Sequence, residues 1–75
     1  MSEVDVWTVS IMLRNESGQT RADAFLQGPE VEVECSGWAD RPRPPAAASG
    51  EDLAAARALR DLSRCLAERA DADRA

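Results

Sequence analysis

The sequence contains no lysine, histidine or tyrosine, and it has only one phenylalanine and two cysteines among 75 residues. Without histidine, the chain lacks the side chain best suited to proton transfer near pH 7. Two cysteines cannot complete a four-ligand zinc site, and they are too few for the disulfide framework of a small secreted domain. We therefore expect a cytoplasmic protein with reduced thiols, no enzyme activity, no metal or cofactor and no small-molecule substrate.

Long apolar runs are also missing from the sequence. The first ten residues have neither a basic segment nor an apolar run of signal-peptide length. No stretch approaches the roughly 18 apolar residues that a membrane-spanning helix needs. We expect no membrane association.

The chain is acidic and short. Fourteen acidic residues outnumber nine arginines, which gives a net charge of −5. A chain of this length forms one domain, here residues 1–75, and buries only about 60% of the surface that its unfolded form exposes. A second copy of the chain would add stability to such a small core, as would a metal or disulfides, and we expect a homodimer.

Alternating apolar residues predict three strands, over residues 5–13, 20–27 and 30–37. In the first strand Trp7, Val9, Ile11 and Leu13 share one face, and Ala22, Ala24, Leu26, Val31, Val33 and Cys35 continue the pattern in the other two. Short turns separate the strands, which is typical of an antiparallel meander. We expect Trp7 to anchor the core.

A proline-rich linker over 38–50 precedes a helix predicted over 51–69, after which the chain is expected to fray. Ala55, Leu59, Leu62 and Leu66 form an apolar stripe on this helix, widened by Ala58 and Cys65. The predicted fold class is α+β, a three-stranded antiparallel sheet with one C-terminal helix packed on one face. Met12, Phe25 and Trp38 fall on the opposite face and are a candidate contact surface for a second molecule.

Five arginines are candidates for RNA contact. Arg57, Arg60 and Arg64 line one side of the predicted helix, and Arg41 and Arg43 lie in the linker. Basic side chains on a rigid helix can contact phosphates. The alternative is a solvated face paired with acidic residues at i,i+4 spacing, and the net charge of −5 favours this alternative.

Two further groups have competing interpretations. Glu30, Glu32 and Glu34 project from one strand face, spaced too widely for one metal ion, and form either a solvated edge or a docking surface for a basic protein. Cys35 and Cys65 both fall on apolar faces and lie near each other if the helix packs on the sheet. They are either small buried side chains or a redox pair.

Four segments, in this order, resemble a family of small actinobacterial domains of unknown function. They are Trp7-x-Val9-x-Ile11, Thr20-x-Ala22-x-Ala24-x-Leu26, Gly37-x-Ala39-x-Arg41-Pro42, and the helix segment Gly50-Glu51-x-Leu53-Ala54-x-Ala56-Arg57-Ala58-Leu59-x-x-Leu62. The sequence departs from that family in its proline-rich linker and in the segment after the helix.

The resemblance implies a fold like that of double-stranded-RNA-binding domains, a tendency to dimerise and no enzyme activity. The family's fold has been compared with that of ribosome hibernation factors. Two functions therefore remain open: a binding or regulatory domain associated with the ribosome, and a homodimeric protein-interaction or structural module that binds no RNA.

Overall fold

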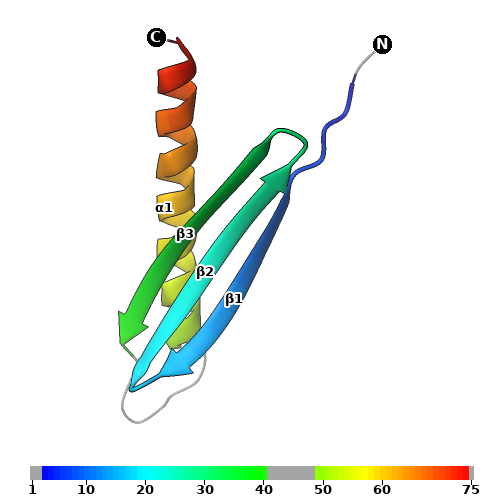
Figure 1. The fold of residues 1–75 in the computed structure, drawn as a ribbon. Coiled ribbons are helices and arrows are strands. Elements are labelled where there is room, and N and C mark those ends of the chain that lie inside the picture. The colour runs from blue at the N-terminus through cyan, green and yellow to red at the C-terminus, as the bar shows by residue number, and fades with distance from the viewer. Residues whose placement is uncertain (1–2, 41–48, 75) are drawn as a thin grey trace.

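The computed structural model describes residues 3–40 and 49–74 and contains three strands followed by one helix (Figure 1). The elements are β1 (Thr8–Glu16), β2 (Gln19–Gly28), β3 (Val31–Asp40) and α1 (Ser49–Arg74). The strands form one antiparallel sheet in the order β1-β2-β3. The predicted α+β class and meander are confirmed. Within the described ranges, no helix combines the length and apolarity that crossing a membrane requires.

Several predicted boundaries were wrong. β1 starts and ends three residues later than expected, because its polar end pairs with β2 as far as Glu16 opposite Gln19. β3 continues through Asp40, which pairs with Gln19, so residues 38–40 belong to the sheet and not to a linker. The helix does not fray after residue 69 but continues to Arg74, in keeping with the high helix propensity of its alanines.

A two-residue turn sets the register of β1 against β2. Ser17 and Gly18 both have positive φ angles, 48° and 79°, as the type I′ hairpin turn requires. Glycine adopts this conformation readily, whereas serine does so at a cost. The turn places Val9, Ile11 and Leu13 opposite Leu26, Ala24 and Ala22, so these apolar residues share one face of the sheet.

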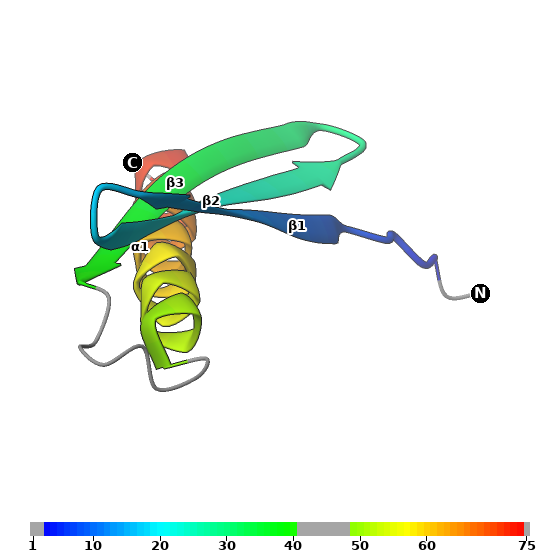
Figure 2. The same ribbon diagram turned by 90° about the horizontal axis from the view of Figure 1, so that it is seen from below.

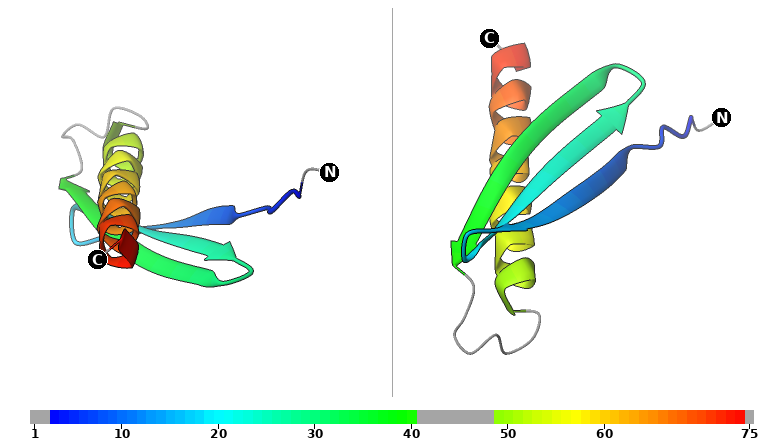
Figure 3. Two further views of the ribbon diagram at one scale, coloured as in Figure 1. Left: turned by 90° about the horizontal axis from the view of Figure 1, so that it is seen from above. Right: turned by 60° about the horizontal axis from the view of Figure 1, so that its bottom comes forward.

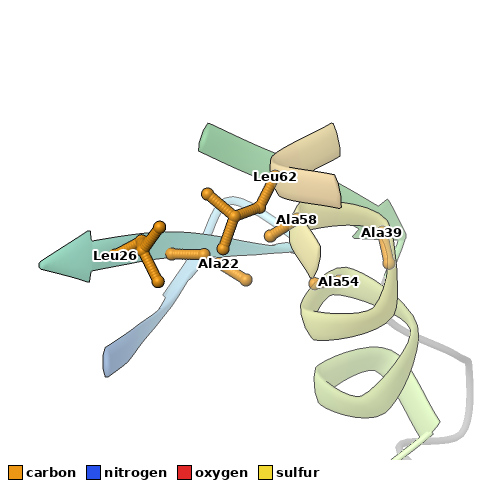
Figure 4. Close-up of a cluster of buried hydrophobic side chains, with 7 residues drawn as sticks. Ala22, Leu26, Ala39, Ala54, Ala58 and Leu62 are labelled. Carbon is orange, nitrogen blue, oxygen red and sulfur yellow. The ribbon is translucent and has the colours of Figure 1, made fainter. Parts of the chain in front are cut away.

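The helix packs on that face, over β3 and β2 (Figure 2). The buried core between them contains five alanines and two leucines (Figure 4): Ala22, Ala24, Leu26, Ala39, Ala54, Ala58 and Leu62. Alanine side chains fill little space, so the helix axis lies close to the sheet.

Gly37 marks the point of closest approach between β3 and α1. A Cβ atom at this position would lie 2.5 Å from the backbone N of Ala58 and 2.6 Å from the backbone O of Ala54. Only glycine leaves room for the helix backbone at this distance. The contact is therefore between two backbones, with no intervening side chain.

Of the three strands, β1 has the least contact with α1, and all nine of its residues are exposed (Figure 3). Trp7, just before it, is 51% exposed, so the prediction that it anchors the core was wrong. A helix about 10 Å wide spans about two strands spaced 4.7–4.9 Å apart, and it leaves the third uncovered. The apolar face of β1 points to the helix side of the sheet without being covered by the helix.

Candidate functional site

The predicted arginine row is exposed on α1, but two of its members already contact other groups. Arg57 donates a hydrogen bond from Nη1 to the backbone carbonyl of Trp38, 2.6 Å away, and so ties the helix to the end of β3. Arg64 Nη2 lies 3.5 Å from a carboxylate oxygen of Asp61, an exposed ion pair of small energetic value. Arg60 is exposed as well. The row therefore resembles a solvated face more than a prepared phosphate site.

Arg41 and Arg43, the remaining candidates for RNA contact, lie outside the described residues. The structure thus brings together only the three helix arginines of the predicted set. With Asp61 in the same row, the positive charge of this face is partly neutralised.

Met12, Phe25 and Trp38 do lie on the sheet face opposite the helix, as the alternation predicted. Met12 and Trp38 are 45% and 42% exposed, and Phe25 is half-buried. The register places Met12 beside Asp23 and Trp38 beside Arg21, so polar residues of β2 separate the two exposed apolar side chains. Their role as an interface stays a prediction.

A polar cluster in the middle of this face was missed in the sequence. Asp23 is only 4% exposed, and one of its carboxylate oxygens accepts hydrogen bonds from Ser36 Oγ at 2.6 Å and Arg21 Nε at 2.9 Å. The Arg21 guanidinium also lies 5.3 Å from the ring centre of Trp38, within the range of a cation–π contact. The signal in the sequence was an aspartate between Ala22 and Ala24 in the central strand.

These contacts favour the ionised form of the carboxyl group. The hydrogen bond from Ser36, followed by the hydrogen bond and charge of Arg21, lowers the pKa of Asp23 below its usual value of 3.8, although burial opposes the change. Every partner of this carboxylate is supplied by the sheet itself, so the cluster stabilises the fold and presents no free acid or base for catalysis.

The carboxylates of Glu30, Glu32 and Glu34 do not gather at one site. Glu32 and Glu34 are exposed on β3, and Glu30 precedes that strand. Within residues 3–40 and 49–74, no three potential metal-ligating side chains come together. These glutamates are therefore solvated side chains of an edge strand, and their charges also discourage another strand from pairing with β3.

The cysteines are the pair that the sequence placed most accurately. Cys35 of β3 and Cys65 of α1 are half-buried free thiols whose sulfur atoms lie 3.3 Å apart. Burial, together with the hydrogen bond and charge of Cys65, raises the pKa of the Cys35 thiol to about 11. Contact between the two thiols was expected from their faces, and it is confirmed.

An uncovered row of apolar residues lies along β1, on the same side of the sheet as the helix. Val9, Ile11 and Leu13 are 46%, 38% and 41% exposed. At one end, Trp7 and Leu66 line an open groove of about 450 Å³ between the start of β1 and the C-terminal half of α1. We call Val9, Ile11 and Leu13 together the β1 row; it is the candidate functional surface.

Sequence reasoning identified the members of the β1 row as one apolar strand face, on the side of the sheet where the helix was expected to pack. Their alternation showed which face of the sheet they occupy, whereas the number of strands that one helix covers decided that they are exposed.

Comparison of the sequence with known proteins identifies its family. No curated protein matches the sequence. A family model described as Rv2632c-like matches residues 5–74, which include all three strands and the helix. Because the match extends over nearly the whole chain, the protein belongs to the Rv2632c-like family.

Proposed function

We propose that the chain is a non-enzymatic interaction module that works as a homodimer, formed by antiparallel pairing of β1 with β1 of a second copy. One observation carries this proposal: the same strand presents an open backbone edge and an uncovered row of apolar side chains. Among the described residues, no strand pairs with the outer edge of β1.

The open edge presents the backbone groups of the β1 row itself. A two-residue hairpin is closed by a hydrogen-bonded pair, here Glu16 and Gln19, and hydrogen-bonded pairs alternate with non-bonded pairs along the ladder. The N–H and C=O groups of Val9, Ile11 and Leu13 therefore point away from β2. Such groups are a template for another strand.

Strand β1 has few of the residues that normally prevent an edge strand from pairing with another chain. Its first six residues, Thr8–Leu13, include no charged residue and no proline, and Arg14 and Glu16 lie near the turn. By comparison, β3 at the other edge carries Glu32, Glu34 and Asp40. The asymmetry favours association at β1 and not at β3.

The sequence of β1 is also complementary to itself. In an antiparallel pair with a two-fold axis at Ile11, Val9 of each copy lies opposite Leu13 of the other, and Ser10 lies opposite Met12. Arg14 lies opposite Thr8, so no like charges meet. The result is a six-stranded sheet that carries both helices on the same face and joins the two β1 rows.

Burial of these side chains supplies the driving force. Fully burying a valine, leucine or isoleucine is favourable by about 1.5–3 kcal/mol, so covering the exposed 38–46% of each residue contributes at most roughly 1 kcal/mol. The two copies contribute three such residues each. Added to the backbone hydrogen bonds of the new strand pair, this favours a dimer whose population depends on concentration.

The test replaces the residue at the two-fold axis, using Ile11→Lys in the full chain. Light scattering after gel filtration should give the wild type twice the monomer mass of 8.1 kDa at high concentration. Because the variant loses two apolar contacts and brings two like charges together, its dissociation constant should rise more than about 100-fold.

Leu53→Lys is the matched control. Leu53 is 44% exposed on α1 and lies outside the β1 row, so this variant changes charge and exposed apolar area in the same way. Its dissociation constant should stay within about 3-fold of the wild type. Circular dichroism of both variants establishes that they remain folded.

Amide hydrogen exchange locates the contact. Exchange at Val9, Ile11 and Leu13 should slow as the protein concentration rises, because dimerisation hydrogen-bonds these N–H groups. A wild type that is monomeric at about 100 μM, or a dimer unaffected by Ile11→Lys, would refute the proposal. If the dimer persists in Ile11→Lys, the predicted surface of Met12, Phe25 and Trp38 is the next to test.

The ribosome-associated function has weaker support from the arginine row, because Arg57 and Arg64 are engaged within the chain. The two functions also predict opposite effects of salt. RNA binding weakens steeply as salt rises, whereas dimerisation of chains with a net charge of −5 strengthens as their repulsion is screened. Co-sedimentation with ribosomes at low and physiological salt, with Arg57, Arg60 and Arg64 replaced by alanine as the comparison, therefore distinguishes them.

A further inference from the structure

The contact between Cys35 and Cys65 joins two elements that are 30 residues apart in the sequence. The two sulfur atoms are 3.3 Å apart, and a disulfide bond is about 2.05 Å long, so about 1.3 Å of movement would bring them to bonding distance. Both residues are half-buried, which leaves the pair accessible to a small reagent. Two small apolar residues would pack at this position equally well, so packing alone does not require two thiols.

We propose that Cys35 and Cys65 are a reversible dithiol–disulfide site, oxidised by a low-molecular-weight disulfide, that fastens α1 to β3. In the first step, the thiolate of one of the two cysteines attacks one sulfur of the small disulfide, and one small thiolate leaves and takes up a proton. In the second step, the other cysteine gives up its proton and attacks the protein sulfur of this mixed disulfide. The second small thiol leaves with that proton, so two electrons pass from the pair to the reagent.

The surroundings of Cys35 disfavour its thiolate. The pKa of Cys35 is raised to about 11, first by burial and then by the neighbouring Cys65 thiol, with a further contribution from Asp61. The Cys35 thiol is therefore a slow nucleophile near neutral pH, and its reaction should speed up as the pH rises. Arg64, the positive charge near Cys35, opposes this effect and lies beside Asp61 on the helix.

The position of the pair determines what oxidation changes. Up to residue 72 of α1, Leu62 is the last buried residue; Cys65 and Leu66 are half-buried, and residues 67–72 are exposed. The thiols therefore lie where the helix loses contact with the sheet. A covalent bond there closes a loop of about 30 residues and holds the C-terminal half of α1 in place.

The test equilibrates the full chain with an excess of oxidised glutathione at pH 8. Intact mass should fall by about 2 Da, and both thiols should resist alkylation until a reductant is added. The melting temperature should rise by roughly 10–20 °C in the oxidised protein and return on reduction. Amide exchange in residues 62–72 should slow on oxidation, whereas exchange in the β1–β2 hairpin should not.

The single variants Cys35→Ser and Cys65→Ser control for nonspecific oxidation. Each should form only a mixed disulfide with glutathione and show no comparable rise in melting temperature. The proposal is overturned if both wild-type thiols remain free in the folded protein, or if oxidation links two chains and does not close a loop within one.

Discussion

The backbone contact at Gly37 allows a quantitative prediction for Gly37→Ala. The new Cβ would meet the Ala58 N at 2.5 Å and the Ala54 O at 2.6 Å, whereas ordinary contacts of carbon begin near 3.5 Å. The helix must therefore move away from β3 by about 1 Å. A smaller side chain at Ala58 would not relieve the clash, because the Ala58 N and the Ala54 O are backbone atoms.

The expected loss follows from the size of the core. A gap of about 1 Å removes a quarter to a half of the attraction between facing atoms, and overpacked cores generally lose 1–3 kcal/mol. The alanines at this interface have no alternative rotamer with which to adapt. We expect a loss of about 2–3 kcal/mol in the free energy of unfolding, or a melting temperature lower by roughly 10–20 °C.

Thermal unfolding followed by circular dichroism measures this loss, and Gly18→Ala is the matched control. Gly18 has a φ of 79° in the hairpin turn, and no atom lies within 4 Å of a Cβ built there. That variant incurs only the conformational cost of about 1–2 kcal/mol. If Gly37→Ala melts at or above the temperature of Gly18→Ala, the close approach of α1 to β3 is refuted.

The remaining predictions concern the polar cluster and the turn. Because the pKa of Asp23 is lower in the folded than in the unfolded protein, its contribution to stability is present above pH 3.8 and is lost as the pH falls below that value. Asp23→Asn should therefore lower stability at pH 7 and flatten its decline between about pH 4 and 2, as denaturant titrations at several pH values would show; an unchanged decline would contradict the role of Ser36 and Arg21. Ser17→Asn should raise the melting temperature by a few degrees, because asparagine tolerates the positive φ of this turn better; a decrease would contradict the type I′ assignment.

The sequence predicted the order, type and facing of the elements well, since these depend on local patterns. Alternation in residues 31–35 and the Gly28-Pro29 turn marked β3 and its start, and the leucine stripe marked α1. The contact of Cys35 with Cys65 followed from the same faces. Periodicity shows which residues share a face of a strand or helix, and the same residues share that face in the folded protein.

What could not be predicted depends on distances between elements. Nothing local to Trp7 or Ile11 indicates that a single helix centred on β3 and β2 leaves them exposed. The partners of Asp23 were hidden for a similar reason, since Ser36 meets it only through the register of β2 with β3. Arg57 reaches the Trp38 carbonyl through the tertiary fold, although its i,i+4 spacing indicated Asp61 as the nearest partner.

The alanine-rich core has a consequence for how the protein responds to temperature. Unfolding exposes less apolar surface when the core contains alanine in place of larger side chains, so the heat capacity change per residue is small. A small heat capacity change flattens the curve of stability against temperature. The monomer should therefore unfold over a broad thermal range and lose little stability in the cold, because its modest stability varies slowly with temperature in both directions.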